Sequence, residues 1–377
     1  MSMEQQVYRG KNTMVDFATI LRMKKPKEIF LVRGKKSFEL CGAKKIVDSI
    51  VDSIKCRVTE FWDFSANPTY EDMQKGLQLL SESHADLIIG IGGGSVLDMS
   101  KIIRFYYSFS EDSITGEFSK QRDLLPLIVL PTTAGSGSEA THFAVIYKDK
   151  IKHSIAHAAI LPDIAFIYSP FTYTNSKYLA ACAGFDALAH AIEAYWNVHT
   201  TNESDEYAIQ AIKLLWHNLP DVVHKQTEEA KDNVSEGSYW AGKAINITKT
   251  TAPHAMSYVL TAHYNIPHGQ AVSFTFPYFF KENFRTTAVF HPSLDIEKHL
   301  AKRDTLYKLL NIDHQDPGIC MQKYIDSIGL TIPAQTFDID FIARNINMER
   351  AANNPVLVLE DIKRQALSYS FTALKRL

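Results

Sequence analysis

One carboxylate and three imidazoles in this sequence could together hold a divalent metal ion. Asp186 and His190 lie four residues apart in GFDALAHAIEAY, a pattern that predicts a helix with both side chains on one face. His254, in TAPHAMSY, and His268, in NIPHGQA, follow far downstream. Such donors suit Fe²⁺ and Zn²⁺, and the bound ion can polarise a carbonyl group. The chain has 14 histidines, and any one of them considered alone more often has a structural role than a metal-binding one. The interpretation as a metal site therefore depends on the residues that flank these four.

A glycine-rich turn, Gly90-Ile91-Gly92-Gly93-Gly94-Ser95, ends an apolar run and opens a helical pattern. Glycines let the backbone approach a phosphate closely, and a helix N-terminus offers free N–H groups and a positive dipole end. The same turn also occurs without a ligand, so both interpretations stay open. Asp98 and Lys101 follow on the first turns of the helix, where they are interpreted as an exposed ion pair at helical spacing.

A second loop, Pro131-Thr132-Thr133-Ala134-Gly135-Ser136-Gly137-Ser138-Glu139, follows another apolar run. Its hydroxyls and glycines could hydrogen-bond the ribose and pyrophosphate of a nucleotide, or form an ordinary polar loop. Two such loops at the ends of parallel strands favour a nucleotide-binding crevice.

Alternating strand and helix patterns position both loops. Strands are predicted at Glu28–Val32, Arg57–Phe64, Leu87–Ile91 and Leu125–Leu130, and helices at Phe38–Ile54, Tyr70–Ser83 and Val96–Tyr107. An antiparallel pair, His142–Tyr147 with Lys152–Ala156, and a short strand at Ala165–Tyr168 follow. The alternation predicts a parallel sheet with helices on its faces.

After Phe171 the strand signals nearly stop and long helical patterns take over. They cover Lys177–Val198, Asp205–Leu219, Glu236–Leu260 and Asp361–Leu377. Pro253 lies inside the third of these and should kink or split it. The 377 residues fit two domains of roughly 100–200 residues each. We therefore expect an α/β domain at residues 1–172 and an all-α domain at residues 173–377.

Composition and charge argue against nucleic-acid-binding, disulfide-stabilised and membrane-spanning proteins. The formal net charge of −2 gives no reason to expect nucleic acid or an anionic membrane as a partner. The four cysteines, Cys41, Cys56, Cys182 and Cys320, are scattered without a CxxC pair, which favours reduced thiols over a disulfide framework. The polar N-terminus lacks a signal core, and no uncharged apolar run approaches the roughly 18 residues of a membrane span. A cytoplasmic protein is expected.

Five motifs in this order resemble the iron-containing alcohol dehydrogenase family. They are GIGGGSVLDMSK, LPTTAGSGSEAT, LPDIAFIYSP, GFDALAHAIEAY and PHGQAV, and the resemblance runs from about Glu28 to the C-terminus, with Asn67-Pro68-Thr69 and Asn354-Pro355 included. That family is similar in fold to dehydroquinate synthase, with an N-terminal dinucleotide-binding α/β domain and a C-terminal helical domain. The resemblance implies a metal-dependent, NADH- or NADPH-linked reductase that turns a small aldehyde into a primary alcohol.

The same resemblance implies roles for individual residues. The metal, iron or zinc, would be held by Asp186, His190, His254 and His268. The cofactor would be held at its pyrophosphate by Gly93, Gly94 and Ser95, along its adenine and ribose by Thr132, Thr133 and Ser136, and elsewhere by Asn67 and Lys152.

The sequence departs from the family pattern at two places. Tyr258 stands where the family often has a second histidine near the proton-transfer path, so Tyr258 and His263 are both candidate proton donors. Gly34, in Arg33-Gly34-Lys35-Lys36, stands where many members carry an aspartate that binds the ribose. An acid there repels the 2′-phosphate of NADP, whereas basic residues can pair with it. NADPH is therefore expected to be accepted, with ordinary solvated charges as the alternative.

The segment AGKAINITKTTAPHAMSYVLTAHYNIPHG is similar to the phosphonoacetaldehyde reductase branch of the family, which makes 2-hydroxyethylphosphonate. Lys249, Thr250 and Thr251 lie just before His254, and Lys243 precedes them. A lysine and hydroxyls there could hold the anionic end of a short substrate, since lysine serves as a point charge for phosphate-like groups. A solvated helix lysine is the alternative. A sulfonate, carboxylate or plain aliphatic aldehyde remains open as substrate.

Other functions remain open from the sequence. One is a general short-chain alcohol dehydrogenase, and another is a dehydroquinate-synthase-like cyclase or lyase that uses NAD transiently. A third is a non-catalytic nucleotide-binding protein. The loaded metal, the physiological direction and the oligomeric state, for which a homodimer is one option, are left undecided.

Overall fold

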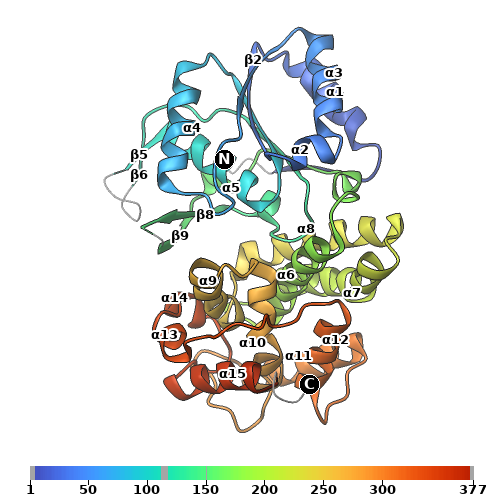
Figure 1. Ribbon diagram of the computed structural model, residues 1–377, viewed down its shortest axis with the longest axis vertical. Helices are drawn as coiled ribbons and strands as arrows, with labels where there is room; N and C mark the ends of the chain where they lie inside the picture. The colour runs from blue at the N-terminus through green and yellow to red at the C-terminus, as the bar shows by residue number, and fades with distance from the viewer. Residues whose placement is uncertain (1–4, 112–117, 150, 374–377) are drawn as a thin grey trace. The chain divides into compact units, whose positions relative to one another are not determined.

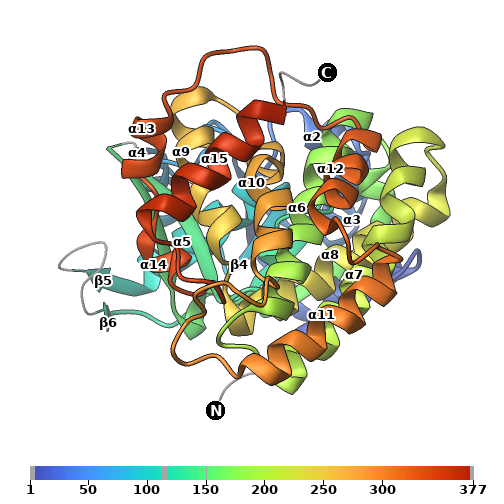
Figure 2. The same cartoon turned by 90° about the horizontal axis from the view of Figure 1, so that it is seen from below.

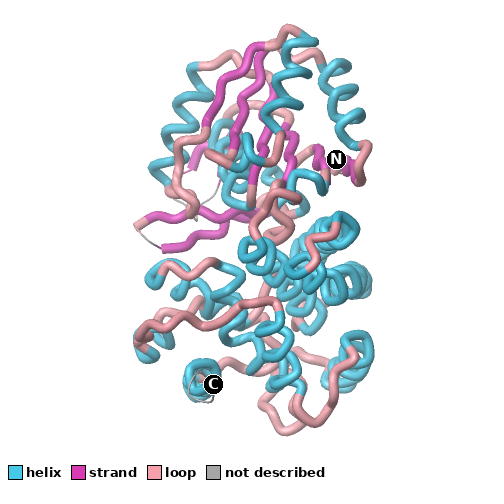
Figure 3. The backbone as a smooth tube through the Cα atoms, turned by 45° about the vertical axis from the view of Figure 1, so that its right-hand side comes forward, coloured by secondary structure: helices cyan, strands magenta, loops and turns pink. Residues whose placement is uncertain are grey.

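The computed structural model describes residues 5–111, 118–149 and 151–373. The chain divides into two compact units, Met1–Asn175 and Ser176–Leu377. The first unit contains the central sheet, and the second is helical over the residues described (Figures 1 and 3). This is the α/β and all-α architecture that the sequence predicts.

A six-stranded parallel sheet forms the centre of the first unit, in the order β1-β10-β7-β4-β2-β3. Its strands are β1 (Gln6–Arg9), β2 (Glu28–Arg33), β3 (Arg57–Phe61), β4 (Leu87–Gly92), β7 (Leu127–Pro131) and β10 (Ile164–Ile167). Strands β4 and β7 are buried along their whole length, and β2 along nearly all of it. They are covered on both faces, so their sequences are continuously apolar rather than alternating.

Helices cover both faces of this sheet. On one face α1 (Thr13–Lys24), α2 (Ser37–Leu40) and α3 (Ala43–Ile54) share an apolar core with the strands, including Ile89 and Ile91 of β4. Gly90 points to the opposite face, where a side chain at that position would meet Ser100 of α5 (Gly94–Ser108). Helix α4 (Tyr70–Glu82) packs beside α5 on that face (Figure 1).

Two parts of this unit differ from the sequence prediction. The single helix predicted at Phe38–Ile54 is wrong: α2 and α3 are separated at Gly42, whose φ of 80° lies in the left-handed region. Strand β1 and helix α1 were not predicted. The antiparallel pair is confirmed as β8 (Phe143–Lys148) and β9 (Ile151–Ala156), and further short elements are β5 (Phe109–Glu111), β6 (Phe118–Lys120), η1 (Ser138–Ala140), η2 (Ala158–Ile160) and η3 (Ser169–Thr172).

The second unit is built around helix α6 (Lys177–Trp196). Every residue of α6 from Gly184 to Trp196 is buried, and several other helices of this unit pack against it (Figure 2). Those described are α7 (Asn202–His224), α8 (Glu228–Thr248), α9 (Ala252–Tyr264), α10 (His268–Glu282), α11 (Ile296–Leu310), α12 (Pro317–Ser327), α13 (Ile339–Arg344), α14 (Met348–Ala351) and α15 (Glu360–Ala373).

The helix predicted at Glu236–Leu260 is split, as Pro253 suggests, but Pro253 does not lie at a kink. It occupies the first turn of α9, where proline needs no backbone donor, and α8 ends at Thr248. Among the described residues, none of the helices combines the length and apolar character needed to cross a membrane.

Candidate active site

The order of strands in the sheet predicts where the first unit binds a ligand. From β2 the chain runs outward to β3, then returns to β4 and continues the other way to β7 and β10. The order therefore reverses between β2 and β4, and open α/β sheets bind ligands at the carboxyl ends of the strands at such a point. Gly93 follows β4 and precedes α5, and Gly34 follows β2, with its N–H donating to Ile91 O at 3.1 Å.

The glycine turn and the second loop touch each other. A Cβ on Gly94 would lie 2.7 Å from Ser136 Oγ, and one on Gly93 would lie 3.3 Å from Thr133 Oγ1. The two predicted cofactor-binding loops are thus brought together at the N-terminus of α5. Side chains larger than hydrogen would fill the space that a pyrophosphate needs beside the helix N–H groups.

Asp98 and Lys101 anchor the second loop. Lys101 is fully buried and donates to Ser138 O at 2.8 Å and to Phe143 O at 2.7 Å, while Asp98 accepts from Ser138 Oγ at 2.5 Å. Burial lowers the pKa of Lys101 to about 8, although Asp98 and Glu139 oppose this. The interpretation of this pair as an exposed ion pair is wrong, because both side chains point from α5 into the loop.

The other predicted cofactor residues lie in the same unit. Thr132 is buried, and its Oγ1 forms no hydrogen bond within residues 5–111, 118–149 and 151–373. Ser95 Oγ donates to Ala66 O, next to Asn67. Tyr147 N donates to Pro68 O at 2.8 Å, and Tyr147 pairs with Lys152 across the hairpin. An unpartnered buried hydroxyl beside two glycine loops fits a polar ligand such as a dinucleotide.

The basic residues at and beyond the end of β2 are partly neutralised. Arg33 Nε donates to Glu60 Oε2 at 2.7 Å, and its guanidinium lies 5.2 Å from the centre of the Trp62 ring. Lys35 Nζ lies 3.2 Å from Asp63 Oδ1. These acidic partners stand at and beyond the end of the neighbouring strand β3, and no sequence pattern predicted the pairing.

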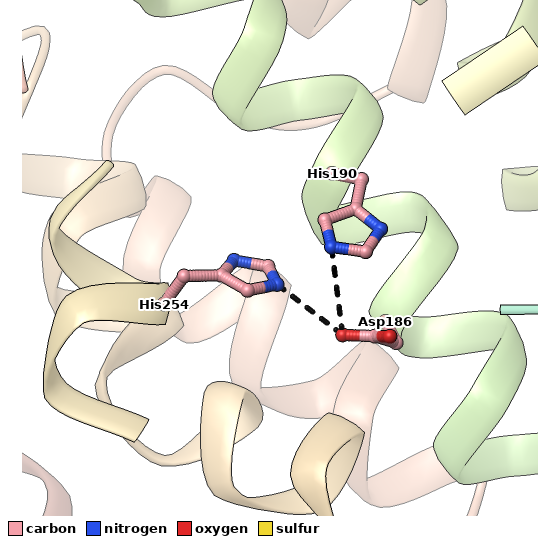
Figure 4. Close-up of side chains that lie close together, drawn as sticks. All are labelled: Asp186, His190 and His254. Atoms are coloured by element: carbon pink, nitrogen blue, oxygen red, sulfur yellow. Dashed lines mark hydrogen bonds and ion pairs between the residues drawn. The ribbon is translucent and has the colours of Figure 1, made fainter. Parts of the chain in front are cut away.

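The predicted metal-binding residues come together inside the second unit. Asp186 and His190 lie on the same face of α6, and His254 approaches from the first turn of α9 (Figure 4). One ligand atom from each lies within 4.8 Å of the other two. From Asp186 Oδ1, the Nε2 atoms of His254, His190 and His268 lie at 3.2, 3.9 and 3.8 Å.

The charges around this group favour a cation. Burial alone would raise the pKa of Asp186, but the surrounding histidines outweigh it and hold the pKa below its usual range. Burial alone would lower the pKa of His254, but the Glu193 and Asp186 carboxylates raise it to about 10. Positive charge beside Asp186 Oδ1 is therefore stabilised, as a divalent cation requires. Oxygen and nitrogen donors held about 2.0–2.2 Å from one ion stand roughly 3.4 Å apart in a tetrahedron, so the observed spacing fits such an ion.

A glycine lets His268 reach this group. Gly269 packs so closely on α6 that a Cβ there would lie 1.9 Å from Cys182 O and 3.1 Å from Asp186 Cβ. A methyl group at this position must push α10 away from α6 and carry His268 with it.

We expect Gly269→Ala to weaken metal binding at least tenfold and to lower the free energy of unfolding by about 1–3 kcal/mol, as overpacking does. Gly237→Ala on α8 is the matched control, because its Cβ would lie 2.7 Å from Leu215 Cγ, remote in sequence from every candidate ligand. That control should lose stability and keep its metal affinity, as measured by competition with a chelator. Parent-like affinity in Gly269→Ala would show that the close approach of α10 does not position His268.

The candidate proton donors lie in different surroundings. The ring of Tyr258 stacks on that of His268, with centroids 5.9 Å apart. His263 is exposed near the end of α9, with its ring 5.0 Å from that of Phe341. The structure therefore brings Tyr258, and not His263, against a candidate metal ligand.

The candidate substrate residues lie at the break between α8 and α9. Lys249 has φ 63° and ψ −172°, a conformation that favours glycine. Asn197 holds this backbone through its Nδ2, which donates to Thr248 O at 3.1 Å and to Lys249 O at 3.3 Å; Asn353 Nδ2 donates to Thr250 O at 2.9 Å. Lys243 instead lies over the Tyr207 ring, 5.2 Å from its centre.

Glu193 is a site residue that the sequence interpretation missed. It is fully buried on α6, and its Oε1 lies 2.5 Å from His254 Nδ1. Its position could have been found from spacing, because Asp186, His190 and Glu193 stand at i, i+4 and i+7 on one helix face.

Family models match both halves of the chain. One, described as iron-containing alcohol dehydrogenase, matches residues 4–169. The other, described as Fe-containing alcohol dehydrogenase family, C-terminal, matches residues 180–311. Together they cover the regions that contain both cofactor loops and the four candidate metal ligands.

Individual relatives point the same way. Long-chain-alcohol dehydrogenase 1 of Geobacillus thermodenitrificans (strain NG80-2) is 31% identical over 242 residues, 62% of this chain but only 61% of that protein. The NADPH-dependent butanol dehydrogenase of Clostridium saccharobutylicum is 30% identical over 296 residues, 76% of this chain and 74% of that protein. The structure of sulfoacetaldehyde reductase from Bifidobacterium kashiwanohense in complex with NAD+ matches with a TM-score of 0.83 and 26% identity, over 97% of this chain and 96% of that chain.

Proposed function

The chain belongs to the iron-containing alcohol dehydrogenase family, and from this premise we propose that it is a metal-dependent reductase that uses NADPH or NADH to convert a small aldehyde into a primary alcohol. The observation that carries this proposal is the buried group of Asp186, His190 and His254, with His268 beside it. Residues 1–172 would bind the cofactor, and residues 173–377 the metal and the substrate.

We assign the metal to Asp186, His190, His254 and His268, whose donors suit Fe²⁺ and also Zn²⁺. When bound, the divalent cation supplies Lewis acidity that polarises the substrate carbonyl. Asp186 balances the positive charge, and the buried setting of its helix face limits access of water. Tyr258 Oη is the preferred proton donor to the product oxygen, since its ring stacks on His268. His263 remains the second candidate from the sequence.

The cofactor is assigned to the first unit. N–H groups of Gly93, Gly94 and Ser95 at the start of α5 would hold the pyrophosphate. The adenine and ribose side would be lined by Thr132, Thr133 and Ser136, with Gly34, Asn67 and Lys152 at the margins. When bound, the reduced nicotinamide supplies the hydride, and the chain fixes its distance and face.

For the substrate we propose phosphonoacetaldehyde, which would give 2-hydroxyethylphosphonate. Support comes from Lys249 and Thr250, which the buried Asn197 and Asn353 hold at the break before His254. The named substrate of the sulfoacetaldehyde reductase relative is likewise a two-carbon aldehyde that bears a tetrahedral anion. Lys243 is a second basic candidate, although its ammonium lies over Tyr207.

The proposal is tested by following oxidation of NADPH and NADH by the metal-loaded chain with short neutral and anionic aldehydes. A reductase consumes the cofactor in proportion to the aldehyde added. A dehydroquinate-synthase-like cyclase or lyase returns its cofactor each cycle, so an absence of net consumption with every aldehyde would contradict the proposal. Efficient reduction of neutral aldehydes alone would leave a general alcohol dehydrogenase.

The basic residues at and beyond the end of β2 lead to a separate prediction about the choice of cofactor. We expect NADPH to be accepted at least as well as NADH, and Arg33→Ala to lower kcat/KM for NADPH about tenfold while leaving NADH unchanged, because a charge-assisted hydrogen bond contributes about 1.5–3 kcal/mol. Arg57→Ala is a matched control, since this exposed arginine pairs with Glu28 at the start of β2. A strong preference for NADH that Arg33→Ala does not alter would contradict the prediction.

A further inference from the structure

Within the described part of the chain, the Glu193 carboxylate makes polar contacts with Thr251 and His254, which lie on another segment. Its Oε2 accepts from Thr251 N at 2.6 Å and from Thr251 Oγ1 at 2.8 Å. Its Oε1 lies 2.5 Å from His254 Nδ1. The side chain is fully buried, and so is that of Thr251. One carboxylate on α6 therefore links the start of α9 to the helix that carries Asp186 and His190.

The chemistry of a carboxylate fixes the proton of His254. An ionised carboxylate accepts hydrogen bonds and does not donate them, so His254 Nδ1 must carry hydrogen. When the imidazole is neutral, its lone pair is then on Nε2, which lies 3.2 Å from Asp186 Oδ1. Only that tautomer presents a metal-binding atom to the group formed with Asp186 and His190.

The same carboxylate fixes the break between α8 and α9. Thr251 is the residue before α9, and its Oγ1 also accepts from Trp196 Nε1 at 2.9 Å. Two residues earlier stands Lys249, with its left-handed backbone. Movement of Thr251 would therefore displace both His254, three residues ahead, and Lys249, two residues behind.

We propose that Glu193 is a positioning residue that sets the tautomer and ring orientation of the metal ligand His254 and, through Thr251, fixes the segment Lys249–Thr251. The inference rests on the proposed function, because it assumes a metal ion held by Asp186, His190, His254 and His268. Histidine ligands held in this way by a carboxylate bind metal more tightly, and loss of the carboxylate typically costs 10–100-fold in affinity.

Glu193→Gln separates this role from simple packing. The amide has one acceptor oxygen and one donor nitrogen in nearly the same shape. If the oxygen keeps both donors of Thr251, the NH₂ group faces His254 Nδ1 and drives the hydrogen to Nε2, where it blocks metal binding. The variant should therefore keep its packing and lose the correct tautomer.

The experiment measures the Kd for Zn²⁺ by competition with a chromogenic chelator, the absorption spectrum of the Co²⁺-loaded chain, and the unfolding temperature of the metal-free chain. We expect Glu193→Gln to bind Zn²⁺ 10–100-fold more weakly and to change the Co²⁺ spectrum, with an unfolding temperature close to the parent. Asp205→Asn is the matched control: this partly buried carboxylate on α7 accepts from Lys302 Nζ at 2.7 Å and is not a candidate metal ligand. It should lose stability and keep the parent's Kd.

The results for the parent and for Glu193→Gln distinguish failure of the positioning role of Glu193 from failure of the proposed metal site. If the parent binds Zn²⁺ tightly and Glu193→Gln binds it equally well with the same Co²⁺ spectrum, Glu193 does not position His254 and the inference is overturned. If the parent itself binds neither ion, the proposed metal site fails, and the inference fails with it. The titrations are made well below the unfolding temperature of each variant, so any loss of stability leaves the affinity measurable.

Discussion

Replacing His268 by alanine is expected to remove most of the bound metal and to lower kcat/KM about 1000-fold or more. The variant would lose one of the four proposed donors to the ion, and Lewis-acid stabilisation of the transition state contributes several kcal/mol, at about 1.4 kcal/mol for each tenfold in rate. The position of His268 supports a direct role, since its Nε2 lies 3.8 Å from Asp186 Oδ1.

The measurement is metal content per chain beside steady-state kinetics. His217→Ala is the matched control, because this exposed histidine on α7 lies in the same unit and is not a candidate ligand. It should retain one ion per chain and parent activity. Full metal content and full turnover in His268→Ala would show that the ligand set is wrong.

Lys249→Ala is expected to lower kcat/KM for phosphonoacetaldehyde 10–100-fold and to change that for a neutral aldehyde of equal length by less than threefold. The physical reason is that the Lys249 ammonium would pair with the anionic end of the proposed substrate, an interaction that a neutral aldehyde cannot make. Lys213→Ala, at an exposed lysine of α7, is the control for loss of a positive charge elsewhere in the unit.

A second substitution at the same position tests why a lysine is kept in an unfavourable conformation. A non-glycine residue at φ 63° and ψ −172° costs about 1–3 kcal/mol. Lys249→Gly should therefore unfold at a temperature no lower than the parent's, and at a higher one if the relief of strain exceeds the added freedom of the unfolded chain. It should nevertheless lose the preference for the phosphonate. Equal efficiency of the parent with both aldehydes would refute the phosphonate assignment and leave the reductase assignment standing.

Much of the first unit could be predicted because its strongest signals are local. Strands β4 and β7 and the interior of β2 lack charged residues and are mostly apolar, and each strand is followed by a glycine or a polar loop. Strand β1 escaped prediction because it is a four-residue edge strand with exposed residues at both ends, so no apolar pattern marks it. The break between α2 and α3 depends on one left-handed glycine, Gly42, which a helical pattern can also contain.

In the candidate site, too, local signals could be predicted and contacts between distant segments could not. The pair Asp186 and His190 could be predicted from helical spacing, and His254 and His268 needed the resemblance to a family. What could not be predicted were contacts between distant segments. A glycine is needed at position 269 because α10 lies against Cys182 of α6. Lys101 hydrogen-bonds Ser138 of the second loop, which lies 37 residues away in the sequence.

The dependence of aldehyde reduction on one bound metal ion is tested by titrating the metal-free chain with Fe²⁺ under anaerobic conditions, and separately with Zn²⁺, while NADPH oxidation by a short aldehyde is recorded. With at least one of the two ions, we expect activity to rise in proportion to the added ion and to stop rising at one equivalent per chain. Full aldehyde reduction by the metal-free chain in the presence of a chelator, or a break at another stoichiometry, would contradict it.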